Sequence, residues 1–128
     1  MTRAVLDSSA VIAALRGEPG GELAASFFGQ SSISAVNLQE VGKWLFDSGV
    51  TERGVRSALD SLNIEVRPHE REDAYFAASL IPHTKRFGRG LGDRSCMALA
   101  IRLGVPALTT DREWIKVEVP GLEVELIR

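Results

Sequence analysis

Residues 4–10 read Ala-Val-Leu-Asp-Ser-Ser-Ala, and these residues are the best guide to the fold class. Its three apolar residues stop at Asp7, which predicts a short buried strand leading into a helix over residues 8–16. Short strands and helices continue to alternate along the chain. That alternation is typical of a three-layer α/β/α sandwich, with helices on both faces of a mostly parallel, five-stranded sheet.

The other elements are predicted from apolar periodicity and from the residues that stop it. Thr51 is expected to cap a helix with Val55, Leu59 and Leu62 on its buried face. Pro82 should close a helix that starts near residue 70. The remaining helices are predicted over residues 22–28, 35–47 and 93–103. The remaining strands are predicted over residues 32–34, over 63–67 as a half-buried strand, over 106–109, and along Leu122, Val124 and Leu126 as an edge strand.

Composition limits the classes of protein to which this chain can belong. Its 128 residues are expected to form one domain, residues 1–128, and no apolar run is long enough to cross a bilayer. We expect no signal peptide, and the single cysteine fits a reducing cytoplasm. The net charge of −2 does not by itself indicate a nucleic-acid-binding protein. Residues 83–94, however, form a locally basic segment.

Four acidic residues stand out by position. Asp7 and Asp111 follow the ends of predicted strands, where parallel α/β sheets bind their ligands. Asp93 heads a helical face that continues with apolar or small residues, including a core cysteine, Cys96. Glu40 shares a helical face with Asn37, beside an apolar stripe. Each acid alone has a second interpretation, because the three aspartates can cap helices and Glu40 can be a solvated helix edge.

Taken together, the four acids favour a metal site. Carboxylates about 5 Å apart repel by roughly 3 kcal/mol per pair at an effective dielectric of 20, so a cation is needed to keep them ionised. Hard divalent ions with oxygen ligands, Mg²⁺ or Mn²⁺, suit such a set and promote phosphodiester displacement. One cysteine and two scattered histidines, His69 and His83, make no zinc site.

The segments around these acids resemble a known family. The four segments are Val-Leu-Asp-Ser-Ser-Ala at 5–10, Ser-Ala-Val-Asn-Leu-Gln-Glu-Val at 34–41, Gly-Leu-Gly-Asp-Arg-Ser-Cys-Met-Ala-Leu-Ala at 90–100, and Leu-Thr-Thr-Asp-Arg-Glu-Trp at 108–114. In this order they resemble the PIN-domain ribonucleases, and more narrowly the VapC toxins of bacterial toxin–antitoxin pairs. The resemblance covers essentially the whole chain.

The resemblance implies an endoribonuclease that cuts RNA with metal-activated water. Its catalytic, metal-binding residues would be Asp7, Glu40, Asp93 and Asp111, holding one or two Mg²⁺ or Mn²⁺ ions. Ser9 and Thr109 match small hydroxyl positions beside the acids, and Asn37 would support Glu40. A homodimer and a small inhibitory antitoxin are the partners implied. The cations expected to meet the RNA backbone are Lys85, Arg86, Arg89, Arg94 and Arg112.

Two other functions share parts of this pattern. A receiver-like phosphoacceptor signalling module needs adjacent acids after the first strand and a lysine after a late strand, and this chain has neither. A phosphatase with Asp7 as nucleophile usually carries a second aspartate where Ser9 stands. The aromatic residues Phe27, Phe28, Trp44 and Phe46 are interpreted either as a groove for an antitoxin helix or as core.

Overall fold

The structure, a computed structural model, describes residues 1–128. Five strands alternate with six α-helices. The strands are β1 (Ala4–Leu6), β2 (Ser31–Ser34), β3 (Glu65–Arg67), β4 (Ala107–Thr109) and β5 (Val124–Leu126). The α-helices are α1 (Ser8–Arg16), α2 (Gly21–Phe27), α3 (Ala35–Asp47), α4 (Glu52–Asp60), α5 (Arg71–Ser79) and α6 (Leu91–Leu103). Three short 3₁₀ turns complete the chain: η1 (Phe28–Gln30), η2 (Ile81–His83) and η3 (Arg112–Lys116).

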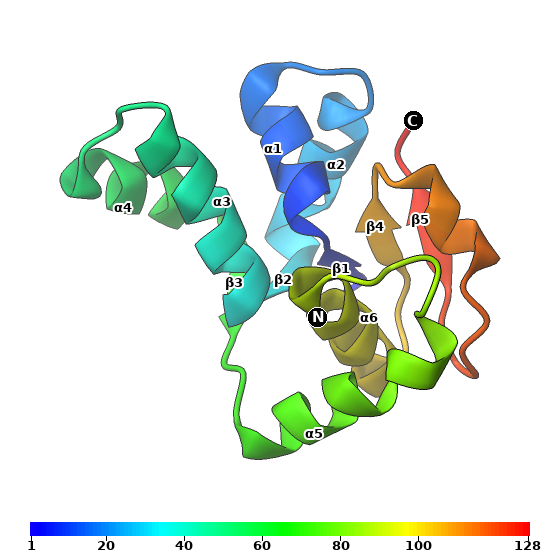
Figure 1. Cartoon of the computed structure of the whole chain (residues 1–128). Helices are drawn as coiled ribbons and strands as arrows, with labels where there is room; N and C mark the ends of the chain where they lie inside the picture. Colours follow the sequence, from blue (N-terminus) through cyan, green and yellow to red (C-terminus); the bar gives the residue numbers. More distant parts are fainter.

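The sheet has the strand order β3-β2-β1-β4-β5, and all four neighbouring pairs are parallel. Strand β1 is central, with Val5 opposite Ser32 on one side and Ala107 on the other. The chain first builds outward from β1 to β3, then returns to place β4 and β5 on the other side (Figure 1). The predicted parallel α/β sandwich is therefore confirmed.

The sheet separates two hydrophobic cores. Alternate residues of β1 face opposite sides, so Ala4 and Leu6 join one core and Val5 joins the other. Helices α1, α2 and α3 supply the first core, while α5 and α6 supply the second. Helix α6 lies next to the sheet and contacts both β1 and α3. This packing brings the start of α6 toward the carboxyl end of the central strand.

Most predicted boundaries hold within one or two residues. Thr51 caps α4 through a hydrogen bond from Gly54 N, 3.2 Å long, and Gly104 ends α6 in a left-handed conformation. Helix α5 ends at Ser79, before Pro82. The expectation of a half-buried strand over residues 63–67 was partly wrong, because β3 is a shorter edge strand and Val66 is 44% exposed.

The aromatic residues divide between core and surface. Phe28 is buried in the first core, and Phe27 packs against that core. Trp44 is half-buried, whereas Phe46 is 49% exposed. The core interpretation therefore holds for Phe27 and Phe28. No helix of this structure is long and apolar enough to span a membrane.

Candidate active site

The site lies where the order of the strands reverses. Strands β2 and β4 flank β1, and the chain leaves β1 and β4 in opposite directions around the sheet. A crevice forms beyond the carboxyl ends of strands at such a point, and ligands of parallel α/β proteins bind there. Asp7 follows β1, and Thr109 ends β4, so both predicted site residues lie at this crevice.

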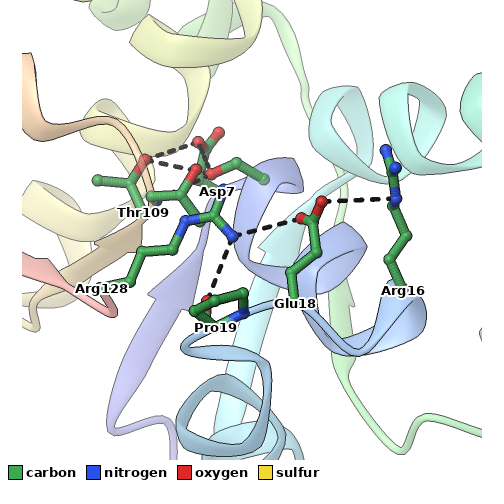
Figure 2. Close-up of polar contacts among 8 residues, drawn as sticks. Asp7, Arg16, Glu18, Pro19, Thr109 and Arg128 are labelled. Carbon is green, nitrogen blue, oxygen red and sulfur yellow. Dashed lines mark hydrogen bonds and ion pairs between the residues drawn. The ribbon is translucent and has the colours of Figure 1, made fainter.

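Asp7 is held by two hydroxyl groups. Its side chain is buried, and its Oδ2 accepts hydrogen bonds from Ser9 Oγ at 2.6 Å and from Thr109 Oγ1 at 2.8 Å (Figure 2). Backbone donors orient both hydroxyls, since Thr110 N donates to Ser9 Oγ and Asp111 N donates to Thr109 Oγ1, each at 3.1 Å. Because an ionised carboxylate only accepts hydrogen bonds, both hydroxyls donate hydrogen bonds to Asp7. The structure thus brings the hydroxyls of Ser9 and Thr109 together on one oxygen of Asp7.

The helix-cap interpretation fails for Asp7. The residue occupies the N-cap position of α1, but its side chain makes no capping hydrogen bond. Burial raises the pKa of Asp7 to about 6, against the hydrogen bonds from Ser9 and Thr109, which lower it. The charges of Asp93 and Glu40 raise it further. A buried carboxyl whose pKa is raised by burial and by neighbouring acids is typical of functional sites.

Glu40 is exposed but not simply solvated. Its Oε1 accepts hydrogen bonds from Asn37 Nδ2 at 2.9 Å and from Ser8 Oγ at 3.0 Å. Asn37 is fully buried and also donates to the Gly92 carbonyl at 3.0 Å, which ties α3 to the start of α6. A Cβ atom at Gly92 would lie 2.3 Å from both carboxylate oxygens of Glu40. The glycine therefore makes room for the carboxylate beside Asp93.

Asp93 and Asp111 combine capping with membership of the site. Asp93 Oδ2 accepts the Gly90 backbone N–H at 3.0 Å, and Asp111 Oδ1 accepts the Glu113 backbone N–H at 3.0 Å. Desolvation raises the pKa of Asp93, and the charges of Asp111 and Glu40 add to that shift, while the Gly90 hydrogen bond and Arg94 oppose it. The capping interpretation is correct for these two residues without excluding a role at a cation.

All four carboxylates share one arrangement. In each, protein donors bond one oxygen, namely Asp7 Oδ2, Glu40 Oε1, Asp93 Oδ2 and Asp111 Oδ1. The second oxygen of each receives no protein hydrogen bond, and none of the four takes part in an ion pair. The fold orients four carboxylates and leaves one oxygen of each open.

This donor set fits Mg²⁺ or Mn²⁺. It is made of oxygen ligands only. The charges of Asp93 and Glu40 raise the pKa of Asp7, and the charges of Asp111 and Glu40 raise the pKa of Asp93. No three acidic side chains converge closely enough to ligate one ion together. Mg²⁺ does not require that, because it usually keeps several waters and takes one or two protein carboxylates.

A family model confirms the resemblance. The model described as PIN domain matches residues 4–120. The chain belongs to the PIN-domain family. No curated protein sequence matches it.

Solved structures share the fold of this PIN domain at low sequence identity. A chain of VapBC2 from Rickettsia felis, bound to a promoter DNA fragment, is 16% identical with a TM-score of 0.74, covering 98% of both chains. A chain of DNA-bound VapBC from Salmonella typhimurium is 19% identical with a TM-score of 0.75, covering 100% of both. VapBC-5 from Mycobacterium tuberculosis is 22% identical with a TM-score of 0.61, covering 100% of this chain and 99% of that one.

The predicted cations are only partly gathered at the acids of the PIN domain. One hollow of about 620 Å³, here called the acidic hollow, adjoins Asp93 and Asp111. Its lining consists of Arg86, Phe87, Gly88, Arg89, Gly90, Asp93, Asp111 and Glu113. Lys85 lies in a neighbouring groove. Arg94 donates instead to the Arg89 carbonyl, and Arg112 lines neither space.

Sequence reasoning missed two residues that position Glu40. The Ser8 hydroxyl bonds Glu40 across 32 positions of the chain, and no local pattern around Ser8 predicts this contact. Gly92 lies directly before the predicted helix over residues 93–103, and its closeness to Glu40 appears only in the structure. A glycine in the first turn of a helix, directly before a candidate ligand, is a signal that close approach is needed there.

Proposed function

We propose that this PIN domain is a divalent-metal-dependent endoribonuclease that acts as the toxin of a toxin–antitoxin pair. The observation that carries the proposal is the set of four oriented carboxylates, each with one oxygen free of protein donors. Such a set is suited to hold divalent cations that also bind a phosphodiester group. Membership of the PIN family favours this function over the phosphoacceptor and phosphatase alternatives.

The protein groups have distinct roles in this proposal. Mg²⁺ or Mn²⁺, when bound, supplies an activated water and neutralises charge at the phosphodiester. Asp7, with its Oδ2 fixed by two hydroxyls, and Asp93, fixed by the Gly90 backbone, would hold the ion. Glu40 and Asp111 approach Asp93 closely enough to raise its pKa and would complete the acidic surroundings. Arg86 and Arg89 line the same hollow as Asp93 and would hold the RNA backbone there.

Cleavage of RNA tests the enzymatic part. We expect purified protein to cut single-stranded RNA with Mn²⁺ or Mg²⁺ present, and to stop in excess EDTA. Asp93→Asn should abolish cutting, whereas Asp60→Asn, an exposed acid at the end of α4, should not change it. Cleavage that survives EDTA, or Asp93→Asn activity equal to that of Asp60→Asn, would exclude the proposed mechanism.

The toxin role rests on the solved structures of the same fold. Three of them are VapBC assemblies, and one more is a toxin–antitoxin complex from Klebsiella pneumoniae with a TM-score of 0.72. For this chain we therefore propose a homodimer, a small cognate antitoxin and a cytoplasmic location. Expression in a bacterial host should arrest growth with the wild type and not with Asp7→Asn. Growth arrest by both forms, or by neither, would contradict a toxin that acts through this site.

A further inference from the structure

A second concave surface adjoins the acidic hollow. It has a volume of about 520 Å³ and is here called the basic groove. Its lining consists of Pro82, His83, Lys85, Arg86, Phe87, Lys116 and Glu118. Arg86 and Phe87 line both spaces, so the basic groove and the acidic hollow are adjacent. The groove joins two segments far apart in the sequence, the loop before α6 and the end of η3.

The ring of Phe87 organises the cations of the groove. Lys116 Nζ lies 4.9 Å from the ring centroid, and Arg86 Cζ lies 5.5 Å from it. At these distances the ring attracts both cations through its quadrupole. Because an aromatic ring carries no net charge, it fixes their positions without neutralising them. The arrangement differs from an ion pair, in which a carboxylate would cancel the field.

The cations of the basic groove have no acidic partners. The six ion pairs of the protein use other cations, on α1, α3, α4, β3, α6 and at the C-terminus, where Arg128 pairs with Glu18 (Figure 2). Glu118 is the single acid in the lining of the groove, and it forms no ion pair with Lys85, Arg86 or Lys116. These unpaired cations lie beside the hollow that Asp93 and Asp111 line, so a positive surface adjoins a negative one.

We propose that the basic groove binds the phosphate backbone of the RNA strand beside the bond that is cut, with Lys116 and Arg86 as its phosphate contacts and Phe87 as the residue that positions them. This inference rests on the proposed nuclease function. The lining of the acidic hollow carries three acids against two arginines, so further cations at its edge favour the entry of a polyanionic strand. Single-stranded nucleic acids bind surfaces that combine cations with aromatic rings, as this groove does. Lys116 lies outside the basic segment that sequence analysis singled out.

Binding of RNA, separated from cutting, tests the groove. Fluorescence anisotropy would follow a labelled single-stranded RNA in the Asp93→Asn background, so that the probe is not consumed. Each phosphate contact on single-stranded RNA contributes about 0.7 to the slope of log affinity against log salt concentration. We therefore expect Lys116→Gln and Arg86→Gln each to lower this slope by about 0.7, and to weaken binding about five-fold at 0.1 M salt. Phe87→Leu keeps both cations but removes the ring that positions them. It should weaken RNA binding with little change in the salt slope.

The matched control is Arg53→Gln. This exposed arginine belongs to α4, which lies on the far side of the molecule from β5 and η3 (Figure 1), and it has no ion pair. The Arg53→Gln variant should bind RNA with the same affinity and salt slope as the Asp93→Asn background. Groove variants that bind RNA as Arg53→Gln does, while melting at the parent temperature, would overturn the inference. So would variants that keep RNA affinity but lose binding to polyglutamate, which would assign the groove to an acidic protein.

The two proposals fail in different ways. If wild-type protein cuts RNA and the groove variants bind it normally, only the groove assignment falls. If no variant and no metal gives cutting, the nuclease function falls, and weakened binding by the groove variants would still show an RNA-binding surface.

Discussion

Replacing Gly92 with alanine separates the geometry of the acidic site from the stability of the fold. Gly92 is the second residue of α6, and its backbone conformation is open to any residue, because its φ is not positive. The added Cβ would lie 2.3 Å from both carboxylate oxygens of Glu40, whereas ordinary contact begins at 3.4 Å. Glu40 must therefore retreat by about 1 Å, since α6 is anchored in the second core and the exposed Glu40 side chain is the mobile partner.

The expected cost to stability is small. The retreat breaks the hydrogen bonds from Asn37 Nδ2 and Ser8 Oγ to Glu40, each of which contributes about 1 kcal/mol. Glu40 then becomes solvated. Alanine in place of glycine stabilises the helix by about 1 kcal/mol. The free energy of unfolding should change by about 1 kcal/mol or less. A displacement of about 1 Å in a catalytic group, by contrast, costs on the order of 100-fold in rate.

The assay compares RNA cleavage, Mn²⁺ affinity by calorimetry, and chemical unfolding for the same variants. Gly42→Ala is the control, because Gly42 lies on the same helix as Glu40 and its Cβ would meet Val55 at an ordinary 3.9 Å. Gly42→Ala should be slightly more stable and fully active. If Gly92→Ala cleaves RNA within three-fold of Gly42→Ala, Glu40 is not held where the reaction needs it, and the reasoning is refuted.

Three further predictions concern groups around Asp7. The pKa of Asp7 is raised from its usual 3.8 to about 6, so the folded state binds the extra proton between those pH values, and the stability contributed by Asp7 falls as the pH rises through this window. In EDTA, Asp7→Asn should therefore raise the free energy of unfolding by up to about 3 kcal/mol at pH 8, with the gain lost near pH 4; a gain that does not depend on pH would contradict burial as its cause. Thr109→Val removes one donor to Asp7 and should weaken Mn²⁺ binding about 10- to 100-fold in calorimetry, with unchanged affinity arguing against orientation by this hydroxyl. Burial raises the pKa of Cys96 well above its usual range, so iodoacetamide should label it only after unfolding, and rapid labelling of the folded protein would show that α6 opens.

Local chemistry made the elements predictable. Apolar spacing, the capping hydroxyl of Thr51 and the left-handed glycine after α6 set where helices begin and end, and these are interactions between near neighbours in the chain. The strand over residues 63–67 was less predictable, because an edge strand has one neighbour and its exposure depends on which helices cover it. Val66 belongs to an alternating apolar pattern, but its side chain stays 44% exposed to solvent.

The candidate site was predictable as a set of acids and not as an arrangement. Local sequence patterns were enough to predict that Asp7 and Asp111 follow strands, that Asp93 heads a helix and that Glu40 borders a buried stripe. The contacts that hold these acids come from the packed fold: the Thr109 hydroxyl reaches Asp7 across 102 positions, and Asn37 joins Glu40 to the Gly92 carbonyl across 55. Sequence periodicity describes one element at a time, whereas these contacts depend on strand order and on α6 packing against both β1 and α3. The same physical reason explains why Lys116 was not foreseen beside Phe87, since nothing local to either residue brings the two together.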